Sequence, residues 1–220
     1  MTILALEFSS AQRRVAVVRP GQPDLSVEAV ETGTGGTGAF RLIENVLAGA
    51  KIEREQIEGL AVGLGPGSYT GVRVAISIAQ GWQLARRVKL LGIGSSQCLA
   101  AQAQVEKIFG RVNVVIDAQR NEFYLAAYDI SPEGWTEIES LRIVPLAELQ
   151  TRAHAGGIWA GPEVTRWLPD GKILFPRAAT LGRLAAGQTD FVWGDHLAPI
   201  YLRETNFVKA PPGRADLGMS

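Results

Sequence analysis

A glycine-rich segment at residues 65–71 has the composition of a tight turn that could bind an anion. The apolar run before it, residues 59–64, is typical of a buried strand, and the residues after it are typical of a helix. Ser68 or Thr70 can cap this helix, whose first backbone N–H groups and dipole attract negative charge. The sequence therefore predicts a candidate nucleotide- or anion-binding turn. Its residues are Gly65, Gly67, Ser68, Thr70 and Gly71.

Other phosphate-binding and nucleophile motifs fit less well. Residues 33–38 match the G-x-G-x-x-G pattern of dinucleotide-binding proteins. The expected strand before them, residues 26–31, alternates polar and apolar residues, whereas the first strand of a dinucleotide-binding unit is buried on both faces. We therefore expect a loop there. The turn at residues 65–71 lacks the lysine of a P-loop and the G-x-S-x-G spacing of a hydrolase nucleophile.

Metal ligands are sparse in this sequence. His154 and His196 are its only histidines, and neither has a second histidine three or four residues away. Asp195 and His196 could form an acid–base dyad, but a solvated or hydrogen-bonded loop pair is the simpler interpretation. Cys98 is the only cysteine, so neither an intrachain disulfide nor a thiolate cluster can form. We predict no metal site, no catalytic residues and no intrinsic cofactor.

Composition narrows the class of protein. The 220 residues are 46% hydrophobic, enough for one domain or two small ones. No apolar run approaches the roughly 20 residues that span a bilayer, and no signal peptide is recognisable, so we expect a cytoplasmic protein without membrane contact. Lys and Arg total 22, as do Asp and Glu, and no dense basic run occurs. This balance argues against nucleic-acid binding by the chain alone.

The elements that must position the turn occur twice. Each half begins with a strand, an acidic residue (Glu7 or Asp117), a polar turn and a second strand. A third strand, a helix and a further strand follow in each half, at residues 25–30, 40–47 and 59–64, and at residues 135–139, 146–149 and 157–160. This repeat of roughly 110 residues predicts two mixed sheets with helices packed on them. We divide the chain into lobes at residues 1–105 and 106–210 and a tail at 211–220.

The helix after the glycine-rich turn carries small residues four apart. Gly71, Ala75 and Ala79 share one face, which allows a second helix from the same chain or from a partner to pack closely. Arg73 and Gln80 favour a partner, because a fully buried helix has little use for them. We predict an interface on this helix and the preceding one, at Leu42, Val46, Tyr69, Val72, Arg73, Ala75, Ile76, Ala79 and Gln80.

Three stretches resemble a known family. Residues 63–85, with residues 115–124 and 199–203 at matching spacing, resemble the TsaB family, also called YeaZ. TsaB is the bacterial subunit of the machinery that makes threonylcarbamoyladenosine in tRNA. The resemblance implies a duplicated actin-like α/β fold (ASKHA, ribonuclease H-like) of two lobes. In this fold paired acidic turns face a cleft and handle ATP and its metal. Here Glu7 replaces the usual aspartate, and Asp117 is in place; a lone acid there is more often a turn residue.

The resemblance also implies a role and partners. The catalytic paralogue TsaD carries two metal-binding histidines at H-x-x-x-H spacing on a helix whose counterpart here, residues 39–47, has none. The chain would then be a non-catalytic partner of TsaD in N6-threonylcarbamoyladenosine (t6A) formation. The ATPase TsaE would join them, tRNA would bind through the complex, and the chain alone would form a homodimer. ATP or ADP with Mg would bind only in the complex. The alternative is an autonomous actin-like ATP-dependent enzyme, or a peptidase-like protein.

Overall fold

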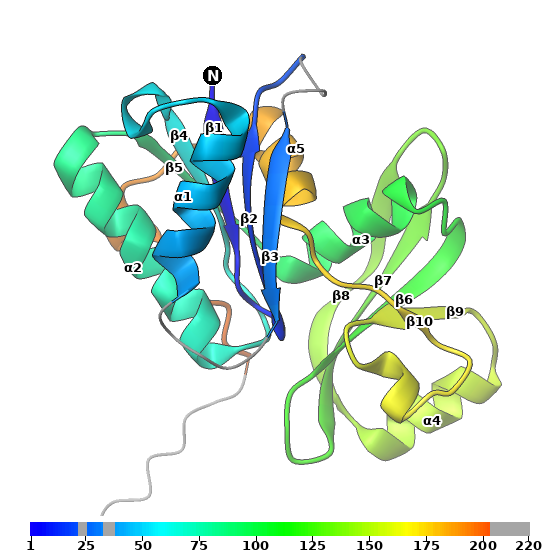
Figure 1. Cartoon of the computed structure of the whole chain (residues 1–220). Coiled ribbons are helices and arrows are strands. Elements are labelled where there is room, and N and C mark those ends of the chain that lie inside the picture. Colours follow the sequence, from blue (N-terminus) through cyan, green and yellow to red (C-terminus); the bar gives the residue numbers. More distant parts are fainter. Residues whose placement is uncertain (22–25, 33–37, 203–220) are drawn as a thin grey trace, which may run out of the picture.

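The computed structural model describes residues 1–21, 26–32 and 38–202. These residues form two lobes, each built on a five-stranded sheet (Figure 1). The first sheet consists of β1 (Ile3–Glu7), β2 (Gln12–Val18), β3 (Val27–Thr32), β4 (Gly59–Gly63) and β5 (Lys89–Ile93). The second consists of β6 (Gly110–Asp117), β7 (Glu122–Ile130), β8 (Trp135–Pro145), β9 (Ile158–Gly161) and β10 (Lys172–Ile173).

The two sheets have the same topology. Their strand orders are β3-β2-β1-β4-β5 and β10-β9-β6-β7-β8, so the first strand of each half is central. In both sheets the first three strands pair as an antiparallel meander. The fourth strand pairs in parallel with the first, and the fifth in parallel with the fourth. The predicted duplicated α/β fold with two mixed sheets is confirmed.

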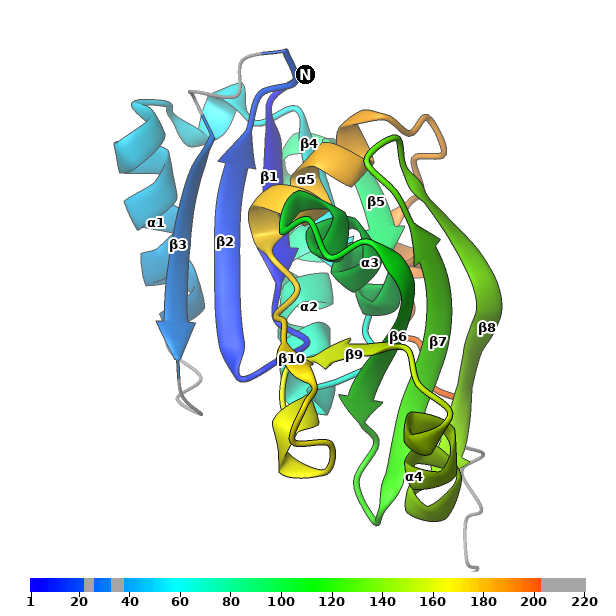
Figure 2. The same ribbon diagram turned by 90° about the vertical axis from the view of Figure 1, so that its right-hand side faces the viewer.

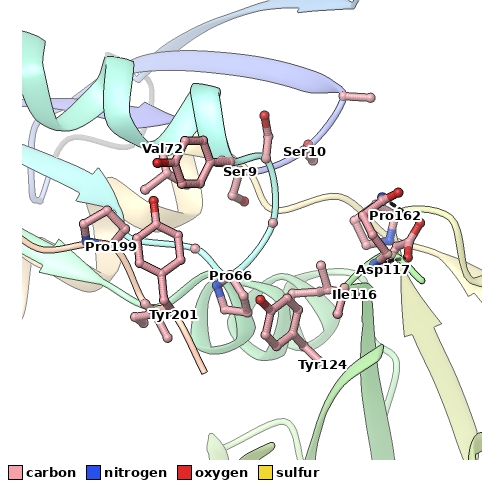
Figure 3. Close-up of a pocket in the computed structure, with 18 of the residues that line it drawn as sticks. Ser9, Ser10, Pro66, Val72, Ile116, Asp117, Tyr124, Pro162, Pro199 and Tyr201 are labelled. Carbon is pink, nitrogen blue, oxygen red and sulfur yellow. Dashed lines mark hydrogen bonds between the residues drawn. The ribbon is translucent and has the colours of Figure 1, made fainter. Parts of the chain in front are cut away.

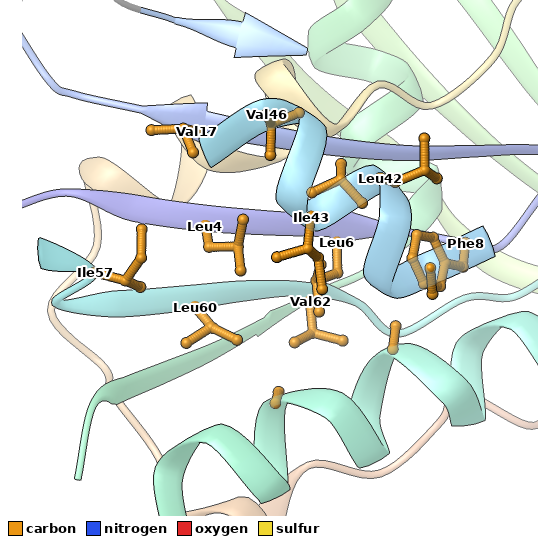
Figure 4. Packing of buried hydrophobic residues seen from close by; sticks show 14 of the residues in the cluster. Leu4, Leu6, Phe8, Val17, Leu42, Ile43, Val46, Ile57, Leu60 and Val62 are labelled. Atoms are coloured by element: carbon orange, nitrogen blue, oxygen red, sulfur yellow. The ribbon is translucent and has the colours of Figure 1, made fainter. Parts of the chain in front are cut away.

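Helices cover both sheets. They are α1 (Gly38–Ala50), α2 (Tyr69–Arg86), α3 (Ser95–Val105), α4 (Leu146–His154) and α5 (Ala178–Ala186). Alternation along β1 explains which helix lies on which face, because successive side chains of a strand point to opposite sides. Leu4 and Leu6 pack under α1 and α2, as Figure 4 shows, whereas Ile3 and Ala5 pack under α5.

Two helices lie between the sheets (Figures 1 and 2). The side chains of α3 pack on the second sheet, whereas α5 returns from the second half to cover β1 and β2. The Thr180 hydroxyl of α5 donates a hydrogen bond of 2.5 Å to the amide oxygen of Gln102 in α3. The predicted split after residue 105 therefore separates the two sheets but not their covering helices. As a domain boundary it stays a prediction.

Some elements follow from the sequence more readily than others. The glycine-rich turn and the meanders lie where they were predicted, whereas β5, α3, β10 and α5 were not predicted. The G-x-G-x-x-G segment lies outside the described residues except for Gly38, which begins α1. The predicted tail at residues 211–220 also lies outside the described residues. Within the described ranges, each helix is too short or too polar to span a bilayer.

Candidate functional site

The glycine-rich turn packs against the turn between β1 and β2. The Ser68 backbone N–H donates a 2.6 Å hydrogen bond to the Ser9 carbonyl. A Cβ atom added at Gly67 would lie 2.0 Å from the Ser9 carbonyl oxygen, and one at Gly71 would lie 2.0 Å from the Phe8 carbonyl oxygen. Gly67 also has φ of +145°, which other residues rarely adopt. Close backbone contact therefore explains these glycines without a bound phosphate.

Ser68 caps α2, as one of the two predicted alternatives. Its hydroxyl accepts a hydrogen bond of 3.2 Å from the Gly71 N–H, so this donor of the helix N-terminus is already used. Of the predicted anion-binding residues, Gly65, Gly67 and Ser68 line a cavity, whereas Thr70 and Gly71 do not. Anion binding at this turn stays a prediction.

The cavity has a volume of about 810 Å³ and lies between the two lobes (Figure 3). Small-molecule sites commonly have this size. Figure 3 shows Asp117 and Pro162 of the second lobe on one side, with Ser9, Ser10 and Pro66 of the first lobe nearby. Further walls come from α2 and from the chain near the C-terminus, at Tyr69, Val72, Arg73, Pro199, Ile200 and Tyr201.

Glu7 does not line this cavity. Its carboxylate is fully buried and accepts hydrogen bonds from the Ser9 N–H at 2.8 Å and from the Ser95 hydroxyl at 3.3 Å. A Cβ atom added at Gly63 would lie 2.2 Å from a Glu7 carboxylate oxygen. Burial raises the pKa of Glu7. Glu7 therefore ties together the end of β1, the end of β4 and the start of α3.

Asp117 does line the cavity, and its carboxylate shapes the turn after β6. It accepts hydrogen bonds from the Gln119 backbone N–H at 2.7 Å and from the Gln119 side chain at 3.1 Å. This is the turn-residue role that a lone acid after a strand usually has. Glu163 lines the same wall, and burial together with the nearby charge of Asp117 raises its pKa.

Glu163 was not among the predicted site residues. Gly65 and Pro66 come after the end of β4 at Gly63, whereas Gly161 is the last residue of β9 and Pro162 and Glu163 follow it.

Cation ligands do not assemble in the part of the chain that the structure describes. No group of three or more His, Cys, Asp or Glu side chains there could hold a metal ion. His196 and Asp195 form an exposed pair 3.8 Å apart. The His154 Nδ1 atom lies 2.7 Å from the Gln150 carbonyl in the last turns of α4. Neither histidine lines the cavity.

Most of the predicted interface residues lie in the core of the chain itself, which corrects the sequence analysis. They are Leu42, Val46, Val72, Ala75, Ile76 and Ala79, all at most 6% exposed. The small residues of α2 do allow close packing, but against the chain's own sheet and α1. The spacing of small residues shows that one face of a helix is closely packed, but it does not show which element covers that face. Tyr69, Arg73 and Gln80 remain at least partly exposed, and an interface there stays a prediction.

The opposite side of α2 is open. We call Arg73, Ser77, Gly81 and Leu84 the outer face of α2; all four are exposed, and Leu84 is 88% exposed. A Cβ atom added at Gly81 would have no neighbour within 4 Å. The helix contains no acidic residue.

A segment near the C-terminus runs along α2, and we call residues 191–202 the C-terminal strap. The Val192 N–H donates to the Leu90 carbonyl at 2.9 Å, and the Ile200 N–H to the Leu64 carbonyl at 2.8 Å. Between these points Gly194 is held by the side chains of Gln80 and Gln83, at 2.7 Å each. These contacts explain why α2 carries Gln80 and Gln83: their side chains hydrogen-bond to the C-terminal strap.

Two matched sheets with a cleft between them define a duplicated α/β protein of the actin-like group. Residues 39–202 match the family model described as TsaD, tRNA N6-adenosine threonylcarbamoyltransferase. The chain is 30% identical over 192 residues to the tRNA threonylcarbamoyladenosine biosynthesis protein TsaB of Escherichia coli strain K12, covering 79% of this chain and 82% of that protein. It belongs to the TsaB (YeaZ) family.

Further similar proteins agree with this assignment. TsaB of Haemophilus influenzae is 31% identical over 126 residues, covering 57% of this chain and 53% of that protein. The solved structure of YeaZ from Pseudomonas aeruginosa superposes with a TM-score of 0.78 at 25% identity, over 91% of this chain and 99% of that one.

Proposed function

We propose that this chain is a non-catalytic subunit in t6A synthesis that acts by pairing with a TsaD-type catalytic subunit. One observation carries the proposal: the similarity to E. coli TsaB extends over 79% of the chain. The name of that relative places it in threonylcarbamoyladenosine biosynthesis. On this proposal the chain works in the cytoplasm, TsaE joins the pair, and tRNA binds through the complex.

The geometry of the acidic turns supports a non-catalytic role. A metal-bound nucleotide in the cleft would need acids from both lobes, but the carboxylate of Glu7 is buried and hydrogen-bonded to Ser9 and Ser95. The residues of the cleft therefore do not fit a metal-bound nucleotide as actin-like enzymes hold it. We propose that the chain has no intrinsic cofactor and that ATP or ADP with Mg enters only with the complex. The same geometry disfavours an autonomous ATP-dependent enzyme.

We place the partner contact on the outer face of α2, with Tyr69 and Gln80 at its border. This surface is supported by the exposure of Leu84 and by the open space at Gly81, which lets a second helix approach closely. In the absence of TsaD the same face would serve a homodimer, so self-association and TsaD binding would compete.

Reconstitution tests this function. Purified TsaD and TsaE of the same organism would receive tRNA and a source of threonylcarbamoyl-adenylate, with and without the chain, and t6A would be measured by mass spectrometry. We expect t6A only when the chain is present, and ATP turnover by the chain alone with magnesium at the background rate. Equal t6A without the chain, or sustained ATP turnover by the chain alone, would contradict the proposal.

A further inference from the structure

Two tyrosines hold the side chain of Arg73 at the start of α2. The Arg73 Nε–H donates a 3.2 Å hydrogen bond to the Tyr201 hydroxyl, and the guanidinium carbon lies 4.3 Å from the centre of the Tyr69 ring. The two tyrosine rings stack with their centres 5.5 Å apart. Residues far apart in the sequence, from α2 and from the C-terminal strap, thus form one cluster.

This cluster presents a guanidinium whose charge is unmatched within the described residues. Its hydrogen bond uses only Nε, and no described carboxylate forms an ion pair with Arg73. Arg73 is nevertheless held in place, so little side-chain freedom remains to be lost when its terminal amino groups bind a ligand. Such a fork matches a carboxylate, which can accept two parallel hydrogen bonds from it.

A second copy of this chain is a poor source of that carboxylate. Apart from Arg73, the only charged residue of α2 is Arg86, and the helix has no acid. Of the acids near it, Glu44 and Glu55 pair with Arg54 at 2.6 Å and Arg86 at 3.0 Å. Asp195 of the C-terminal strap lies 3.8 Å from His196, beside Gly194 at the level of Gln80, about two helical turns from Arg73. Two copies meeting on the outer face of α2 would bring like charges together, which disfavours the contact.

We propose that Tyr69, Arg73 and Tyr201 form a receptor for a carboxylate of a different protein, and that this charge selects a heterologous partner over a second copy. The inference rests on the proposed function, because it takes the TsaD-type subunit as that partner. Tyr201 acts as a positioning residue for Arg73. The C-terminal strap is therefore part of the binding surface.

The charge of Arg73 is tested by comparing two associations. The dissociation constant with TsaD of the same organism would be measured by calorimetry, and self-association by analytical ultracentrifugation. Arg73→Glu is expected to weaken TsaD binding about 10- to 100-fold, the usual size of a lost charge-assisted contact. Self-association should stay the same or strengthen. Lys172→Glu, an exposed site in β10 with the same change of charge, should alter neither.

Removing the hydroxyl of Tyr201 tests whether this residue positions Arg73. Tyr201→Phe keeps the ring but removes the hydrogen bond, and it should weaken TsaD binding about 3- to 10-fold. In an Arg73→Ala background the same change should have no further effect on binding, because the group that it positions is gone. A purely structural tyrosine would weaken binding equally in both backgrounds.

Specific outcomes overturn the inference and leave the proposed function standing. One is TsaD binding by the unaltered chain together with equal effects of Arg73→Glu and Lys172→Glu. Another is a loss of self-association as large as the loss of TsaD binding. A third is an effect of Arg73→Glu that appears only when tRNA is added, which would make a phosphate the ligand. Absence of TsaD binding by the unaltered chain would instead overturn the proposed function itself.

Discussion

The two acidic turns occupy equivalent places in the two lobes but have different surroundings. Glu7 ends β1 and is buried under the backbone of β4, whereas Asp117 ends β6 and lines the cavity between the lobes. The topology of the two halves is the same, so the difference comes from a few side chains and backbone contacts. One turn is part of the core of the first lobe, and the other faces the cleft. A duplicated fold can therefore keep its topology while one of its acidic turns is buried and the other faces a cleft.

The turn after β1 packs closely against the glycine-rich turn because glycines stand at the points of contact. Replacing one of these glycines should have the largest effect on stability. Gly71→Ala would place a Cβ atom 2.0 Å from the Phe8 carbonyl oxygen, and we expect it to lower the free energy of unfolding by about 3 kcal/mol or more. Gly81→Ala is the matched control on the same helix. It enters open space and should stabilise the protein by about 0.5–1 kcal/mol. Chemical denaturation measures both; equal effects would mean that contact with the Phe8 carbonyl is not what requires glycine.

The buried carboxylate of Glu7 should have a smaller effect, and its sign depends on pH. Because burial raises its pKa above the ordinary value of 4.5, the folded state holds the Glu7 proton more tightly than the unfolded state. The free energy of unfolding should therefore decline as pH rises from about 4.5 through the raised pKa. Glu7→Gln has no such proton. Its stability relative to the unaltered protein should be constant below this window and increase across it.

Denaturant unfolding of both proteins at several pH values gives this difference directly. Glu7→Ala serves as the control for the hydrogen bonds. It leaves the partners on Ser9 and Ser95 unsatisfied, and we expect it to be about 2–3 kcal/mol less stable than Glu7→Gln at every pH, because neither variant carries the titrating proton. A pH-independent difference between Glu7→Gln and the unaltered protein would show that the Glu7 carboxylate is not held in a desolvating environment.

Substitution of Asp117, in the turn after β6, should have the smallest effect on stability, because this side chain lines the cleft and is not buried in the core. Asp117→Asn removes a like charge near Glu163 and should lower the pKa of Glu163 toward its ordinary value. An asparagine can still accept the hydrogen bond from the Gln119 N–H, so stability should change little. A pH titration followed by NMR measures the pKa. An unchanged pKa of Glu163 would show that the two carboxylates do not interact, and it would weaken the contrast between the two acidic turns.

Local sequence signals predicted the parts of this fold that depend on neighbouring residues. The cap at Ser68 and the two meanders follow from turn chemistry and alternation, and both were found. The packing of α5 on the first sheet was not found, because Leu181 and Ala185 meet β1 and β2 only through a contact across most of the chain. The predicted boundary after residue 105 placed residues 178–186 in the second lobe, and no helix was predicted there.

The candidate site was predicted less completely for the same reason. The spacing of Gly71, Ala75 and Ala79 indicated close packing, but it could not say that the sheet of the same chain lies against them. Tyr201 and Arg73 are 128 residues apart, and their contact has no local signature. Glu163 is set apart by burial and by the nearby charge of Asp117, which is 46 residues away in the sequence, so it has no local signature either.

The central claim is that this chain acts through the outer face of α2 and not through the acidic residues Asp117 and Glu163 of the cleft. Reconstituted t6A formation with TsaD tests it most directly, by comparing Ser77→Trp on that face with the double variant Asp117→Asn and Glu163→Gln in the cleft. Both sets of residues lie outside the buried core, so circular dichroism should show folded proteins. We expect Ser77→Trp to abolish t6A formation and the cleft variant to retain it. Loss of activity in the cleft variant with normal activity of Ser77→Trp would contradict the account.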